Sequence, residues 1–231
     1  MLFAHYSTDS RVTIMSSSSG ISEGPAAGKF YAFQAVQKSP NTSPNDVIVV
    51  LDGDDYLLTD QALNIIERKY AEEKAWMTYG SFVGKWSEQV TDLDPRLYSE
   101  DVEWRQTEWV YGHPRSFKVF LLDYVRSVTL ETPCCKIYST SIHFSAYTSS
   151  AHVYSVEDFH KPDGTFLTKC SERGFLLRMF EVSGPKRVAY IADKIYYYRS
   201  TEKNTYKIIS KKEKEMQVSQ CPVYVKQQVC C

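Results

Sequence analysis

The feature that most constrains this chain is a short apolar run that ends directly in a cluster of acidic residues. Residues 47–51 read VIVVL, the longest purely apolar run in the sequence, and DGDD follows at residues 52–55. A continuous run of β-branched and apolar residues is typical of a strand buried on both faces of a parallel sheet. Open α/β sheets bind their ligands at the carboxyl ends of such strands. The sequence therefore predicts a ligand site at Asp52, Asp54 and Asp55.

The segments on either side of this run alternate between helical and strand patterns. Apolar residues recur either at helical spacing, with polar residues opposite them, or in short strand-like runs. We expect helices over 24–37, 60–74, 113–125 and 171–185, and strands over 76–83 and 188–198. A helix, a buried strand and another helix are typical of an α/β domain with a mostly parallel sheet flanked by helices.

The length and composition favour one folded domain. The 231 residues suffice for one sizeable domain, and a hydrophobic content of 43% excludes a disordered chain. A net charge of −1 gives no positive field that would bind nucleic acid. We interpret residues 1–206 as a single domain and 207–231 as a C-terminal tail. Residues 127–156 are nearly free of charge and show no sustained period, so we interpret them as an irregular insertion.

The cysteines and the N-terminus bear on the compartment. The six cysteines form no CxxC pair, and their spacing fits no zinc-ribbon pattern, so we interpret most of them as reduced thiols. The first residues lack a basic segment followed by an apolar one, which a signal peptide would have. The apolar run over 47–51 is far shorter than the roughly 20 residues of a membrane span. We expect a cytoplasmic protein with no membrane span.

The three carboxylates point to a divalent cation. Carboxylates so close together repel one another, and sharing a divalent cation keeps all of them ionised. Asp52, Asp54 and Asp55 are thus candidate ligands of Mn²⁺ or Mg²⁺, whose remaining positions substrate phosphates would fill. The alternative is a solvated acidic turn in front of the following helix. Two enzyme classes use acidic residues at this position, namely phosphatases of the haloacid-dehalogenase type and glycosyltransferases that use nucleotide sugars.

The order of further motifs separates these two classes. The motifs are STDS at 7–10, EGPAAGKFYAFQAVQ at 23–37, DVIVVLDGDDYL at 46–57, MTYGSF at 77–82, HPRSFK at 113–118 and SERGFLLRMFEVSG at 171–184. In this order the chain resembles the family 2 glycosyltransferases, which have the Rossmann-like GT-A fold. The resemblance covers roughly residues 1–125 and 157–205. The chain starts after the position of the family's first strand, so we expect either a sequence that is truncated at its N-terminus or an incomplete nucleotide pocket.

The resemblance implies a function and a mechanism. It implies a metal-dependent enzyme that transfers a sugar, with inversion, from a UDP- or GDP-sugar donor to a carbohydrate or other hydroxyl acceptor. It places Asp9 in the donor-nucleotide region and Glu172 at the position of the general base for the acceptor hydroxyl. The first turn of a helix keeps a carboxylate such as Glu172 ionised, which makes it a modest base.

Four further residues are candidates for binding the two substrates. The small residue Gly24 precedes a predicted helix, where phosphate can approach backbone N–H groups, and Lys29 lies in that helix. Both are candidates for the donor side, together with Asp52 and Asp54. His113 and Arg115 resemble the acceptor-side loop of the family, and an arginine there can pair with a diphosphate or an acidic acceptor.

Two other functions remain open from the sequence. The missing first strand and the irregular 127–156 segment favour a catalytically degenerate GT-A relic that acts as a binding protein. The haloacid-dehalogenase phosphatases carry their acidic motif near the N-terminus and usually continue with Gly-Thr or Gly-Val. Here Asp55 follows instead, and a helix and some 45 residues precede the motif, which makes the phosphatase the weaker alternative.

Overall fold

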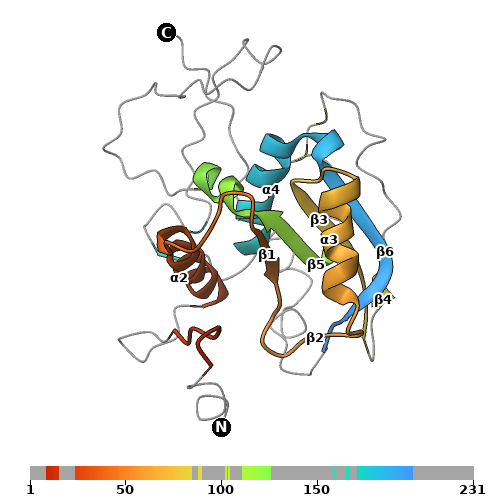
Figure 1. Ribbon diagram of the computed structural model, residues 1–231, viewed down its shortest axis with the longest axis horizontal. Coiled ribbons are helices and arrows are strands. Elements are labelled where there is room, and N and C mark those ends of the chain that lie inside the picture. The colour runs from red at the N-terminus through yellow and green to blue at the C-terminus, as the bar shows by residue number, and fades with distance from the viewer. Residues whose placement is uncertain are drawn as a thin grey trace, which may run out of the picture.

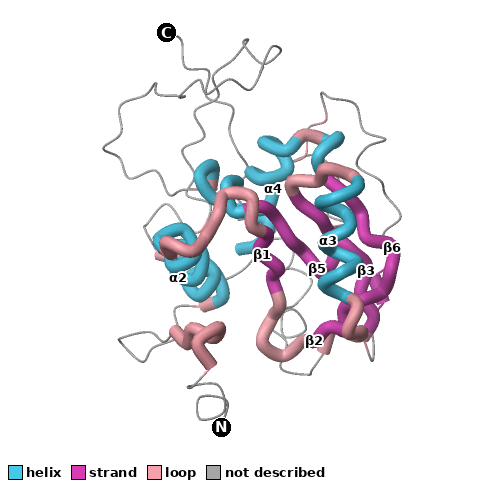
Figure 2. Tube along the Cα trace, viewed as in Figure 1, coloured by secondary structure: helices cyan, strands magenta, loops and turns pink. Residues whose placement is uncertain are grey.

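The computed structural model describes residues 9–15, 24–84, 88–89, 111–125 and 171–199, together with residues 102, 104, 159, 165 and 166. The helices are α2 (Pro25–Lys38), α3 (Ala62–Glu72) and α4 (Ser171–Ser183), and two short 3-10 helices are η2 (Val119–Tyr124) and η3 (Pro185–Arg187). The strands are β1 (Val47–Val50), β2 (Tyr56–Leu57), β3 (Met77–Val83), β4 (Glu88–Gln89), β5 (Gly112–Lys118) and β6 (Val188–Tyr197). Figures 1 and 2 show these elements. The predicted 127–156 insertion and 207–231 tail lie outside the described residues.

The strands form one mixed sheet in the order β1-β5-β3-β6-β2, with β4 paired to β3. Only β3 and β6 run parallel among the described pairs, with Met77 opposite Val188. The pairs β1–β5, β2–β6, β3–β4 and β3–β5 are antiparallel. The α/β class is therefore confirmed, but the prediction of a mostly parallel sheet is wrong for these strands.

Strand β1 lies at the edge of the described sheet. It pairs with β5 alone, from Val47 opposite Lys118 to Val50 opposite Arg115. Val47 is 37% exposed, and the other three residues of β1 are half-buried. The prediction of a strand buried on both faces of a parallel sheet is thus wrong, because an apolar run does not by itself reveal which neighbours a strand has.

The segment predicted as a helix over 113–125 is a strand followed by a 3-10 helix. Strand β5 lies between β1 and β3, and every residue from Gly112 to Phe117 is buried. Phe117 and Leu121 are spaced as on a helix, and both are fully buried, yet they belong to two different elements. Pairing along both edges of β5 overrides the helical spacing, since tertiary context outweighs local pattern in short segments.

Helices cover both faces of the sheet. On one face, α2 and α4 contribute Phe33, Phe175 and Phe180 to a core that also contains Met77 and Phe117 of the sheet. On the other face, α3 packs Ala62 and Ile66 against Ile191 and Ile195 of β6; α3 crosses in front of the sheet in Figure 1.

The remaining predicted helices and strands, over 24–37, 60–74, 76–83, 171–185 and 188–198, are confirmed. In the part of the chain that is described, no helix has both the length and the apolar character that a membrane crossing needs.

A glycine allows β3 and β5 to approach closely near the site described below. A Cβ atom on Gly80 would lie 2.9 Å from Pro114 Cδ and 3.1 Å from the carbonyl oxygen of His113. The register of β3 against β5 shifts between Thr78 and Gly80, as at a β-bulge or a similar irregularity. A larger residue at position 80 would therefore press on the backbone at His113 and Pro114.

We expect Gly80→Ala to lower the free energy of unfolding by about 1–3 kcal/mol, because a methyl group would be forced into a packed space. Urea denaturation measures the change. Gly28→Ala is the matched control, since a Cβ on Gly28 meets no atom within 4 Å and alanine favours the helix α2 by about 0.5–1 kcal/mol. An equal stability of the two variants would contradict the packing argument.

Candidate functional site

The acidic turn after β1 is held by a tyrosine from the last strand. The Tyr196 hydroxyl accepts a hydrogen bond from the backbone N–H of Asp52 (3.3 Å) and donates one to Asp55 Oδ2 (2.6 Å). The backbone N–H of Arg199 donates to the other oxygen of Asp55, at 2.8 Å. Burial raises the pKa of Asp55, although these hydrogen bonds oppose the rise. Both oxygens of Asp55 are thus used within the protein, and Asp55 fixes the turn.

Lys29 of α2 links two carboxylates that come from distant parts of the chain. Its Nζ atom lies 3.4 Å from Asp52 Oδ1 and 3.2 Å from Glu172 Oε1. Glu172 lies in the first turn of α4, and Asp52 follows β1. The side chain of Lys29 is only 16% exposed. One ammonium group therefore partly neutralises both carboxylates, and it does so in a largely buried place.

Arg115 of β5 forms an ion pair with the other oxygen of Glu172. The Arg115 side chain is 8% exposed, and its Nε–H donates to the carbonyl oxygen of Tyr111 at 2.9 Å. Burial alone would raise the pKa of Glu172, but the positive groups around it, led by Arg115, lower it to about 2. Glu172 is therefore a firmly ionised carboxylate with both oxygens paired.

His113 of β5 faces the same carboxylates without a hydrogen bond. Its ring stacks on Tyr196 with centroids 4.7 Å apart, and its Nε2 atom lies 3.8 Å from Asp52 Oδ2. That distance is too long for a hydrogen bond. Nδ1 is buried and has no hydrogen-bond partner. Burial, reinforced by the charge of Arg115, lowers the pKa of His113 to about 3, so the ring is neutral at pH 7.

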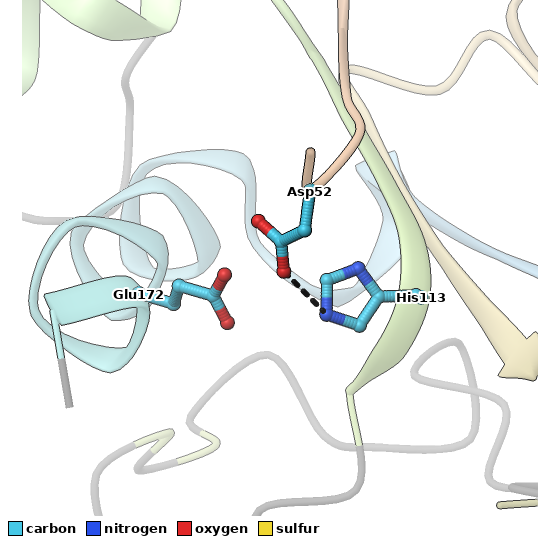
Figure 3. Close-up of side chains that lie close together, drawn as sticks. All are labelled: Asp52, His113 and Glu172. Atoms are coloured by element: carbon cyan, nitrogen blue, oxygen red, sulfur yellow. Dashed lines mark ion pairs between the residues drawn. The ribbon is translucent and has the colours of Figure 1, made fainter. Parts of the chain in front are cut away.

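Three of these side chains point into one space. Figure 3 shows Asp52 and Glu172 with their carboxylates toward each other and the His113 ring beside Asp52. One ligand atom from each residue lies within 4.8 Å of the other two. Among the described residues, Asp52, His113 and Glu172 form a group whose spacing could hold a metal ion. The arrangement can hold a cation or bind a charged substrate group.

The structure unites part of the predicted site. Five predicted residues meet in one place, which we call the polar cluster: Lys29, Asp52, His113, Arg115 and Glu172.

Other predicted residues do not join the polar cluster. In the described part of the chain, Asp9 pairs with Arg11 (2.7 Å), and Gly24 precedes α2 with open space where a Cβ would be. Asp54 is exposed and has no ion pair with the cluster. Asp55 serves the turn instead. No sequence pattern indicates that Tyr196 holds the turn, because alternation along a strand does not reveal which side chain reaches the acidic residues.

Comparison with known proteins returns no match: no protein-family model fits the chain, and no curated protein is similar to it. The fold and the site themselves define an α/β protein with a mixed sheet and a partly buried, charge-paired polar cluster beside the end of β1.

Proposed function

We propose that this protein is a GT-A-like glycosyltransferase that moves a sugar from a nucleotide-diphosphate donor to a hydroxyl acceptor. One observation carries the proposal: the polar cluster joins residues from α2, the DGDD turn, β5 and α4. These are four of the segments on which the resemblance to family 2 glycosyltransferases depends. Residues expected to bind the donor thus lie beside residues expected to face the acceptor, as a direct transfer requires.

The cations of the polar cluster suit a leaving diphosphate. Breaking the bond between the sugar and the diphosphate places negative charge on phosphate oxygens, which preorganised positive groups stabilise. Lys29 supplies one such group, mostly shielded from water. In our proposal Lys29 exchanges part of its contact with Asp52 and Glu172 for the diphosphate, and Arg115 holds Glu172 in place.

The cation predicted from the sequence does not fit the residues predicted to hold it. Asp55 uses both of its oxygens for Tyr196 and the Arg199 N–H, and Asp54 is exposed outside the polar cluster. We derive no step of the transfer from a cation at Asp52, Asp54 and Asp55. The role of Glu172 as general base rests on the resemblance alone and stays a prediction. Its paired oxygens and its pKa of about 2 make it a weak base in this structure.

We expect Asp52→Asn to lower the rate of sugar transfer by on the order of 100-fold, because Asp52 holds the Lys29 ammonium group in the place where it would stabilise the leaving diphosphate. The measurement is release of UDP or GDP from a panel of UDP- and GDP-sugars in the presence of hydroxyl acceptors. Asp60→Asn, an exposed change just before α3, is the control and keeps the activity of the unchanged protein.

Two further assays distinguish the alternative functions, a binding relic and a phosphatase, from the proposed transferase. A relic that only binds would be stabilised by a nucleotide sugar in a thermal melt without releasing UDP or GDP. A phosphatase would hydrolyse a generic phosphomonoester such as p-nitrophenyl phosphate. Hydrolysis of that ester, or no turnover with any donor in the panel, would contradict the proposed transfer.

A further inference from the structure

We infer that Asp52, His113 and Glu172 bind a divalent first-row transition-metal ion, and that the Lys29 ammonium takes the place of this ion in the metal-free protein. This ligand set differs from the acidic turn that the sequence predicts. The inference deepens the proposed function and rests on it only for the use of the ion in transfer. Binding of the ion is a separate property that is measured without any substrate.

The spacing of the three ligand groups is close to that of a metal site. Their ligand atoms lie within 4.8 Å of one another. Three ligand atoms that are evenly spaced around one ion, each about 2.1 Å from it, lie at most about 3.6 Å apart. Side-chain movements of roughly 0.7–1 Å would therefore bring the three groups onto one ion. The carboxylates come from a turn and a helix end, and His113 comes from a central strand.

His113 is the observation that distinguishes this cluster from an ordinary group of acidic side chains. The residue is 5% exposed, and neither ring nitrogen has a hydrogen bond within the described part of the chain. Its Nε2 atom lies 3.8 Å from Asp52 Oδ2 and faces the carboxylates. Imidazole is a common metal ligand through either ring nitrogen, so Nε2 can bind an ion that the two carboxylates hold.

The charges of the site also favour exchange of Lys29 for an ion. Lys29 Nζ lies between Asp52 Oδ1 and Glu172 Oε1, the two carboxylates that an ion would share. A doubly charged ion in that space would repel the ammonium group, and the flexible lysine stem allows it to leave. The metal ion and Lys29 therefore compete, and the protein keeps its two carboxylates balanced in either state.

The donor atoms select the type of ion. Mg²⁺ prefers oxygen ligands and near-ideal octahedral geometry, whereas imidazole suits later first-row ions, and Mn²⁺ accepts mixed oxygen and nitrogen sets. Two carboxylates with one imidazole thus favour Mn²⁺ or Zn²⁺ over Mg²⁺.

The test is a titration of the metal-free full chain with Mn²⁺, in which electron paramagnetic resonance measures the loss of the free-ion signal. We expect saturation at one ion per chain and little competition from an equal concentration of Mg²⁺. Asp52→Asn, His113→Gln and Glu172→Gln should each weaken binding by at least about 100-fold, since even outer-shell partners of a metal site contribute 10–100-fold. Circular dichroism confirms that each variant is folded.

Two further variants make the outcome decisive. Lys29→Met should strengthen Mn²⁺ binding at least about 10-fold, because it removes the competing ammonium group. Asp54→Asn should leave binding unchanged. The inference is overturned if neither the unchanged protein nor Lys29→Met binds Mn²⁺, or if Asp54→Asn loses binding while His113→Gln keeps it. Mn²⁺ binding without sugar transfer would support the metal site and contradict the proposed function. Sugar transfer by a protein that binds no Mn²⁺ would support the proposed function and contradict the metal site.

Discussion

Replacing Arg115 by methionine is expected to lower the free energy of unfolding by about 3–5 kcal/mol, measured by urea denaturation in the presence of EDTA. Arg115 is 8% exposed on its side chain and pairs with Glu172, which is 23% exposed. Methionine fills a similar volume but leaves the carboxylate largely buried, with Lys29 as its ion-pair partner among the described residues. It also removes the hydrogen bond from Arg115 Nε–H to the carbonyl oxygen of Tyr111. Removing one partner of a buried ion pair lowers the free energy of unfolding by more than the intact pair raises it.

A double variant and a second ion pair test this explanation. Arg115→Met combined with Glu172→Met should recover most of the lost stability, because an apolar pair of similar volume often replaces a buried ion pair at little cost. Lys69→Met breaks the half-buried pair with Glu73 at the C-terminal end of α3, in which both side chains are 24% exposed, and it should lower the free energy of unfolding by less than about 1 kcal/mol. A double variant as unstable as Arg115→Met alone would show that the unpaired carboxylate is not the cause.

Phe117→Ala is expected to lower the free energy of unfolding by about 3–5 kcal/mol, because it empties the middle of the larger core. Phe117 is fully buried on β5, opposite Met77 of β3 and Ile48 of β1. Its ring meets Phe33 of α2 edge to face at 5.5 Å and Phe175 of α4 at 6.3 Å. The side chain therefore joins three of the elements that supply the polar cluster.

The matched control for this change is on the neighbouring strand. Val47 of β1 is opposite Lys118 and is 37% exposed. Val47→Ala should cost less than about 1 kcal/mol, since little apolar area leaves a buried place. Urea denaturation of both variants gives the comparison. Similar losses in the free energy of unfolding for Val47→Ala and Phe117→Ala would contradict the argument that burial in the larger core makes Phe117 stabilising.

Elements with a strong local pattern could be predicted from the sequence. Helices α2, α3 and α4 have apolar residues at helical spacing, and β3 and β6 have strand-like runs. In contrast, residues 113–125 have apolar residues at a helical spacing from Phe117 onward, and the strand form of β5 depends on pairing with β1 and β3. The direction and edge position of β1 likewise depend on which strand lies next to it, and no property of VIVVL encodes that choice.

The site could be predicted as a set of residues but not as a set of contacts. The acidic turn identified Asp52 correctly as a member of the polar cluster, yet the role of Asp55 depends on Tyr196, far away in the sequence. The sequence also assigned His113 to the acceptor side, while the structure sets it against Asp52. These differences arise from the mixed sheet, which brings β5 next to β1 and so places its side chains at the acidic turn.

The parallel pairing of β3 with β6 has a consequence for how the chain is made. Val188, the partner of Met77, leaves the ribosome long after β3 does, and no earlier strand in the described chain fills that edge. Until then the nascent protein presents an open strand edge beside the apolar side chains of β3, which is a surface that chaperones cover and that otherwise aggregates. Production of this protein should therefore respond to slower translation and to chaperone supply more than its size suggests.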